Sequence, residues 1–134
     1  MIRKIDHIAV AVTCLEDEIK RYEEILGLPL KGTEVVEAQK VRVAFFQVGD
    51  VSIELMEPTA ADSPISAFLE KRGGGIHHIA FEVDDIVGQI AAVEEKGARM
   101  LNPEPRNGAH DSLVAFAHPK SFSGVLLEFT QRGR

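Results

Sequence analysis

The sequence is poor in several features that mark special classes of protein. Its 134 residues include a single cysteine, Cys14, so no disulfide can form within the chain. This favours a reducing compartment, and we expect a cytoplasmic protein in which Cys14 is a small buried residue. No apolar run is long enough to cross a bilayer. The apolar stretch near the start lacks the small-residue cleavage site of a signal peptide.

Basic residues are also in the minority. Lysine and arginine total 15, against 21 aspartates and glutamates, giving a net charge of -6. This balance disfavours nucleic acid or an anionic membrane as a partner. The composition, 45% hydrophobic and 27% charged, is typical of a globular domain. We therefore expect one domain, with its own core, over residues 1–134.

The chain does contain an internal repeat. Ile76-His77-His78-Ile79-Ala80 resembles Ile5-Asp6-His7-Ile8-Ala9, and a glycine, Gly27 or Gly97, follows the helical pattern in each copy. The first copy predicts a strand, a helix and three strands, at 2–12, 15–26, 30–37, 41–48 and 51–57. The second predicts the same order at 76–83, 85–96, 98–102, 112–118 and 124–130.

This order predicts an α+β fold of two tandem βαβββ modules. We place the modules at about residues 1–58 and about 76–134, with a connector at about 59–75 that contains a short helix and ends in three glycines. Each module would expose one face of a small sheet, and packing the two together would bury apolar surface in a curved mixed sheet. Residues at equivalent places in the copies would then converge near a pseudo-twofold axis.

Two histidines and two glutamates occupy such equivalent places. His7 and His78 lie in the first strands, and Glu54 and Glu128 lie in the last strands, each between two large apolar neighbours. A glutamate that faces a sheet interior is costly unless a cation pairs with it. We therefore predict that these four residues bind one divalent ion at the centre of the sheet. Imidazole and carboxylate donors without thiolate suit cobalt, nickel, manganese, zinc or iron(II) rather than a structural zinc.

Each ligand taken alone has a plainer interpretation. A single histidine in a strand is more commonly a core or surface residue, and a glutamate at a strand end is more commonly solvated. The repetition favours the joint metal site. Glu57 and Glu82 remain alternative ligands, although Glu57 is expected to be exposed. His77 is expected to point to the opposite face of its strand from His78.

Duplicated modules with this His, Glu, His and Glu pattern resemble the vicinal oxygen chelate superfamily. Its members include glyoxalase I, extradiol dioxygenases, fosfomycin-resistance enzymes and bleomycin-binding proteins. Within it, several stretches resemble the methylmalonyl-CoA epimerase family in particular. The more specific of these are Asp62-Ser63-Pro64-Ile65, Asn107-Gly108-Ala109-His110 and His118-Pro119-Lys120-Ser121.

The resemblance implies that His7, His78 and Glu128 bind the metal, with Glu54 at a position that is glutamine in some epimerases. It also implies a glyoxalase-like fold and a homodimer that acts on an acyl-CoA, with cobalt favoured over zinc, nickel or manganese. Some relatives carry a proposed catalytic glutamate where this chain has Val43, so one proton-transfer group is unassigned.

The implied activity is exchange of the 2R and 2S epimers of methylmalonyl-CoA through a metal-stabilised enolate. Glu128 and Glu54 are the candidate proton-transfer groups, and His110 and Lys120 are candidate substrate contacts. The phosphates of coenzyme A could meet Lys40 with Arg42, or Lys71 with Arg72. Two alternatives stay open. One is a glyoxalase I-like lactoylglutathione lyase, and the other is a metal-free drug-binding resistance protein.

Overall fold

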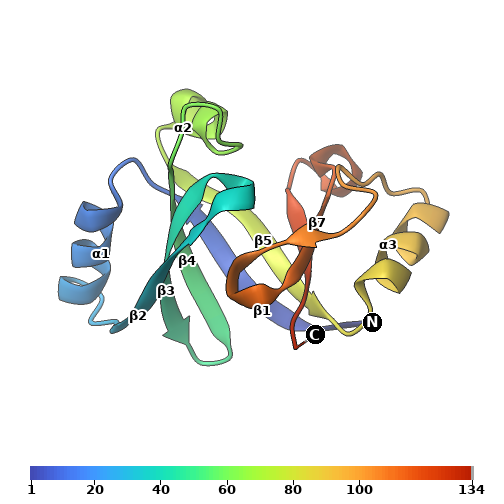
Figure 1. Cartoon of the computed structure of the whole chain (residues 1–134), viewed down its shortest axis with the longest axis horizontal. Helices are drawn as coiled ribbons and strands as arrows, with labels where there is room; N and C mark the ends of the chain where they lie inside the picture. Colours follow the sequence, from blue (N-terminus) through green and yellow to red (C-terminus); the bar gives the residue numbers. More distant parts are fainter. Residues whose placement is uncertain (134) are drawn as a thin grey trace. The chain divides into compact units, whose positions relative to one another are not determined.

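The computed structural model describes residues 1–133 (Figure 1). Over this range the chain forms eight strands and three α-helices, in the order of two βαβββ modules joined by a short helix. The elements are β1 Ile2–Ala11, α1 Leu15–Glu24, β2 Leu30–Val36, β3 Val41–Val48, β4 Val51–Pro58, α2 Ser66–Arg72, β5 Gly75–Val83, α3 Ile86–Glu95, β6 Arg106–Asn107, β7 Leu113–Ala117 and β8 Leu127–Gln131. The predicted mixed α+β class and module order are confirmed.

The predicted strand at 98–102 is wrong. Within it only Met100 makes a β-bridge, to Ala117, and the strand at this place in the module is the two-residue β6. Asn102 accounts for the interruption, because its side-chain oxygen accepts a hydrogen bond of 3.0 Å from the backbone N–H of Phe116. That donor would otherwise be available to a neighbouring strand. Prolines at 103 and 105 then remove two further donors that a strand would use.

Contacts divide the described residues into two compact units. The first unit is His7–His77, and the second combines Met1–Asp6 with the chain from His78 onward. β1 therefore contributes its first residues to the second unit and its last residues to the first. This division differs at β1 from the modules of the sequence, which place the whole strand in the first copy.

In the first unit, the strand order is β2-β3-β4-β1. β1 runs parallel to β4, while β3 pairs antiparallel with both β4 and β2. Helix α1 lies against β3 and β4 (Figure 1). The buried residues of the core between them are Val12, Leu15, Ile19, Ala44, Phe46 and Leu55.

The second unit repeats this plan with the order β5-β8-β7-β6. β5 runs parallel to β8, and β7 pairs antiparallel with both β8 and β6. Helix α3 contacts β7 and β8 (Figure 1). Its core consists of Val83, Ile86, Ile90, Ala115 and Phe129.

In both long helices the first backbone N–H donates a hydrogen bond to a side chain from the last strand of the same module. The backbone N–H of Leu15 donates to Glu57 Oε2 at 2.9 Å, and that of Ile86 donates to Gln131 Oε1 at 2.8 Å. A helix leaves its first N–H groups without intrahelical partners, so each contact supplies an acceptor that the helix needs. Glu57 is thus half-buried and caps α1, whereas the sequence predicted an exposed residue.

Cys14 corrects another prediction. It is exposed rather than buried, at the N-cap position of α1. Val12 before it and Leu15 after it point into the core, while Thr13 and Cys14 between them are exposed. Across the described residues, no helix combines the length and the apolar character needed to cross a membrane.

Candidate metal centre

The predicted ligands occupy matching places in the two units. In the first unit, the parallel pairing of β1 with β4 sets Ala9 opposite Glu54. In the second, β5 and β8 set Ala80 opposite Glu128. Both alanines are fully buried, and their small side chains leave room for the longer glutamate beside them. The histidine lies two residues before the alanine in each case, and therefore on the same face of its strand.

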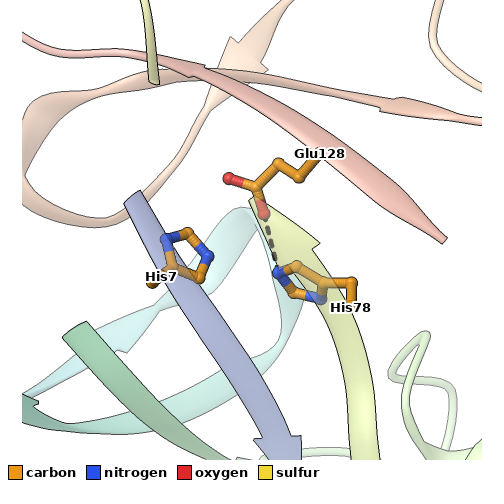
Figure 2. A group of neighbouring side chains, drawn as sticks. All are labelled: His7, His78 and Glu128. Carbon is orange, nitrogen blue, oxygen red and sulfur yellow. Dashed lines mark ion pairs between the residues drawn. The ribbon is translucent and has the colours of Figure 1, made fainter. Parts of the chain in front are cut away.

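Each histidine pairs with the glutamate of its own unit. His7 Nδ1 lies 3.3 Å from Glu54 Oε2. His78 Nε2 lies 2.8 Å from Glu128 Oε1, the ion pair drawn as a dashed line in Figure 2. The side chains of both pairs are between 4% and 7% exposed. Each buried carboxylate therefore faces an imidazole nitrogen of its own unit, Nδ1 in the first unit and Nε2 in the second. Burial makes any electrostatic interaction of these groups stronger than it would be in water.

An aromatic ring lies on the other side of each glutamate. Phe45 is the antiparallel partner of Glu54, and Phe116 is the partner of Glu128. The Phe116 ring meets the His78 ring edge-on, with centroids 5.1 Å apart and planes at 90°. Each pair is thus flanked by alanine and phenylalanine, which exclude water without competing as ligands.

The donors form groups that could hold a metal ion. His7, His78 and Glu128 offer ligand atoms that all lie within 4.8 Å of one another (Figure 2), and Asp6, His7 and Glu54 form another such group. The donor chemistry fits a divalent ion, because neutral imidazole and carboxylate together suit borderline metals. The buried carboxylates fit as well, since a bound cation would offset the cost of burying their charge.

Asp6 was missed by the sequence analysis. It is buried and accepts two hydrogen bonds from Arg132, each 2.7 Å long, in a bidentate ion pair within the second unit. A bidentate arginine fixes the plane of the carboxylate as well as its position. The sequence shows Asp6 in a strand that also carries Arg3, Lys4 and His7, but it does not show that the cationic partner of Asp6 is Arg132, 126 residues away.

The two predicted substrate contacts lie on turns of the second unit. His110 is exposed and has a left-handed backbone with φ of 54°, and Asp111 next to it has φ of 56°. Lys120 is exposed in the 3-10 turn Pro119–Phe122, where its backbone N–H donates to His118 Nδ1 at 3.0 Å. Both side chains are exposed on these turns.

Three of the four basic residues predicted as contacts for the phosphates of coenzyme A have local partners. Lys40 pairs with Asp62, and Arg42 pairs with Glu16. Arg72 lies over the ring of Phe68, 5.1 Å from its centroid. These basic residues are thus already engaged in local contacts.

Two further positions bear on the chemistry. Val43, where some relatives are expected to carry glutamate, is 2% exposed, and its aliphatic side chain cannot accept a proton. Glu82 is half-buried in β5, two residues beyond Ala80 and so on the same strand face as His78.

Comparison with known proteins shows the family to which the chain is similar. The family model described as Glyoxalase/Bleomycin resistance protein/Dioxygenase superfamily matches residues 6–116. The ethylmalonyl-CoA/methylmalonyl-CoA epimerase of Cereibacter sphaeroides is 41% identical over 133 residues, which are 98% of this chain and 99% of that protein.

Solved structures are similar over almost the whole chain. A methylmalonyl-CoA epimerase in complex with methylmalonyl-CoA and NH4+ has a TM-score of 0.95 and 37% identity, covering 99% of this chain and 96% of that one. A variant of the Streptomyces coelicolor methylmalonyl-CoA epimerase, in complex with 2-nitronate-propionyl-CoA, has the same TM-score of 0.95, identity of 37% and coverage of 99% and 96%.

Proposed function

The chain belongs to the glyoxalase/bleomycin resistance protein/dioxygenase superfamily, and we propose that it is an isomerase that interconverts the 2R and 2S epimers of methylmalonyl-CoA. The observation that carries this proposal is the duplicated, buried His–Glu pair in a chain 41% identical to an epimerase along almost its full length. The two His–Glu pairs would hold the ion that stabilises an enolate, and the similarity to the epimerase indicates that methylmalonyl-CoA is the thioester that forms it.

We assign His7, Glu54, His78 and Glu128 as the protein ligands of one divalent ion. Two neutral nitrogens and two carboxylates would leave the ion electrically balanced in a site that excludes most water. Cobalt is our first choice, and zinc, nickel and manganese are alternatives with the same donor preferences. When bound, such an ion supplies Lewis-acid stabilisation of the negative charge that develops on the thioester oxygen.

The chain's own groups must move the proton. Epimerisation removes the hydrogen from carbon 2, which lies between two carbonyl groups, and returns a proton to the opposite face. Glu128 is our candidate for proton transfer at one face, because its carboxylate is buried beside apolar groups where water does not compete. Glu54 is the corresponding sequence candidate for the other face. A carboxylate can serve in this way when one oxygen is free of the metal.

Other residues would hold the substrate. Phe116 and Ala80 exclude water around Glu128, which protects a reactive enolate from side reactions. We assign His110 and Lys120 as substrate contacts, since both are exposed on turns and can interact with carboxylate or phosphate groups of an acyl-CoA.

The test follows the hydrogen on carbon 2. The protein is stripped of metal and incubated with methylmalonyl-CoA in deuterated buffer, with and without cobalt(II), and exchange is followed by NMR. We expect exchange and inversion only with the metal. Metal binding without exchange would reject the epimerase assignment, and the glutathione hemithioacetal of a glyoxalase I-like lyase would be tried next. Absence of metal binding would point instead to a drug-binding protein of the same fold.

We further propose that the protein is a cytoplasmic homodimer. Support for the location comes from the single cysteine, which suits a reducing compartment, and support for the dimer comes from the family resemblance. Light scattering combined with size-exclusion chromatography would measure the mass in solution, and a monomer at micromolar concentration would reject the dimer.

A further inference from the structure

The first unit carries a second carboxylate on the same face as His7 and Glu54. One face of its sheet packs against α1 through residues such as Ala44 and Leu55. Glu54 precedes Leu55 in β4 and so points to the opposite face, which its cross-strand partner Ala9 shares with His7, two residues earlier in β1. The pairing of β2 with β3 is irregular between Leu30 and Gly32, and this irregularity changes which side chains of β2 lie on that face.

That irregularity decides where Glu34 points. Leu30 packs against the α1 core, so without the irregularity Gly32 and Glu34 would share its side of the sheet. With it, Gly32 pairs with Phe45 and Glu34 pairs with Val43. Direct antiparallel partners share a face. Glu34 therefore lies on the face of the sheet that carries the metal ligands.

Glu34 lies at the end of an apolar row. Its partner Val43 pairs in turn with Met56, and Met56 pairs with Ala11. These three residues are 2–4% exposed, whereas Glu34 is half-buried. The next row along the strands contains Ala9, Glu54 and Phe45. A carboxylate thus borders buried apolar surface, one row from the proposed metal ligand.

We infer that Glu34 is the second proton-transfer group of the epimerase, an inference that rests on the proposed function. The side chains of direct cross-strand partners have Cβ atoms about 4.5–5.5 Å apart. Glu34 can therefore reach the space that a glutamate at position 43 would occupy. In this assignment Glu54 acts as a metal ligand only, and Glu34 takes the proton-transfer role at the face of carbon 2 that Glu128 does not serve.

The proton balance of the reaction is complete with these groups. One carboxylate, Glu128 for one epimer, accepts the hydrogen of carbon 2 as a proton, and the electron pair of the broken C–H bond passes into the enolate. The other, Glu34 in its protonated form, donates its proton to the opposite face and forms the new C–H bond. The two groups exchange roles for the other epimer, so no further reactant is needed.

The experiment compares Glu34→Gln with the wild-type holoenzyme loaded with cobalt. Each epimer is incubated separately in deuterated buffer, and both exchange at carbon 2 and inversion are measured. We expect inversion to fall by about 100-fold or more in the variant, in line with the loss of a general acid–base group. Exchange without inversion should persist for the epimer whose hydrogen faces Glu128. A merely structural role would lower exchange of both epimers together.

Two further variants test whether the effect depends on the carboxylate of Glu34 in particular. Glu37→Gln, an exposed glutamate three residues away, makes the same charge change and should invert at the wild-type rate. The double variant Glu34→Gln with Val43→Glu moves the carboxylate to the cross-strand partner, and restored inversion would support the assignment. Cobalt absorption spectra should match the wild type in Glu34→Gln.

The outcomes separate the two proposals. If Glu34→Gln inverts both epimers within a few-fold of the wild type, the assignment of Glu34 is overturned while the epimerase function stands. If the cobalt-loaded wild type shows no exchange with either epimer, the proposed function itself fails.

Discussion

In each unit, cross-strand partners form rows of side chains on the face that carries the predicted metal ligands. One such row is alike in the two units, and the next row differs. The shared row contains alanine, glutamate and phenylalanine, as Ala9, Glu54 and Phe45 in the first unit and as Ala80, Glu128 and Phe116 in the second. The following row reads Ala11, Met56, Val43 and Glu34 in the first unit, but Glu82, Thr130, Val114 and Arg106 in the second.

This difference teaches how a duplicated fold can handle an unsymmetrical molecule. Under the proposed function, a single ion would accept equivalent ligands from both copies, which suits a row that is alike in the two units. A methylmalonyl thioester would present different groups on its two sides, which suits a neighbouring row that differs. Its outer strand carries a carboxylate, Glu34, in one unit and a guanidinium, Arg106, in the other.

The largest expected effect tests whether the two glutamates of the shared row have equal roles. Glu128→Gln should lower the rate of epimerisation by about 10²–10⁴-fold, because glutamine cannot accept the proton. Glu54→Gln should retain most of the rate, since an amide oxygen can still bind the ion. Rates are measured with saturating cobalt, and metal affinity is measured by calorimetry. Near-wild-type turnover in Glu128→Gln, or equal losses in both variants, would contradict the assignment.

A smaller effect concerns the helix caps, where the units use different residues for one purpose. Glu57→Ala and Gln131→Ala should each lower the free energy of unfolding by about 0.5–2 kcal/mol, because each removes the side-chain acceptor at a helix start. Urea denaturation measures both. Glu57→Gln and Gln131→Glu serve as matched controls that keep an acceptor oxygen, and they should lose less than the alanine variants. An alanine variant as stable as the wild type would show that its cap is dispensable.

The smallest expected effect is on Tm, and it comes from two exposed aspartates, one in each unit. The hydrogen bond from Lys40 lowers the pKa of Asp62, and the hydrogen bond from the N-terminal ammonium lowers the pKa of Asp84. A lowered pKa in the folded state stabilises the protein above the unfolded pKa, and this contribution is lost as pH falls through the folded pKa. Asp62→Asn and Asp84→Asn should therefore slightly lower Tm at neutral pH.

The Tm difference between each asparagine variant and the wild type should disappear in acid. Thermal unfolding from neutral to strongly acidic pH measures it. Both carboxylates are solvent-exposed, so salt should also reduce the difference at neutral pH. A difference that grows on acidification would show that the sign of the linkage is wrong.

Much of this architecture could be predicted from periodicity and repetition. The alternation of β1 and β5 and the glycines after α1 and α3 gave the module order, because these patterns depend on local backbone geometry. The repeat also singled out Glu54 and Glu128, which recur in the same apolar setting, and in the structure each is buried beside the histidine of its own unit. That these four side chains bind a metal ion stays a prediction.

Features that depend on side chains from distant segments could not be predicted. The strand at 98–102 failed because the side chain of Asn102 accepts a backbone hydrogen bond from Phe116. Glu57 was assigned to the surface because only the fold brings it to the start of α1. Glu34 was overlooked for a similar reason, since an irregular pairing in β2 reverses the face on which it lies.

The division of β1 between the two units has a consequence for how the protein folds. The first unit is one continuous stretch, His7–His77, so its pairings can form without the rest of the chain. The second unit needs contacts between distant segments, such as the pair of Asp6 with Arg132, which are 126 residues apart. Such long-range pairing slows folding. We therefore expect the later residues of β1 to pair with β4 first, and the earlier residues of the same strand to join the second unit afterwards.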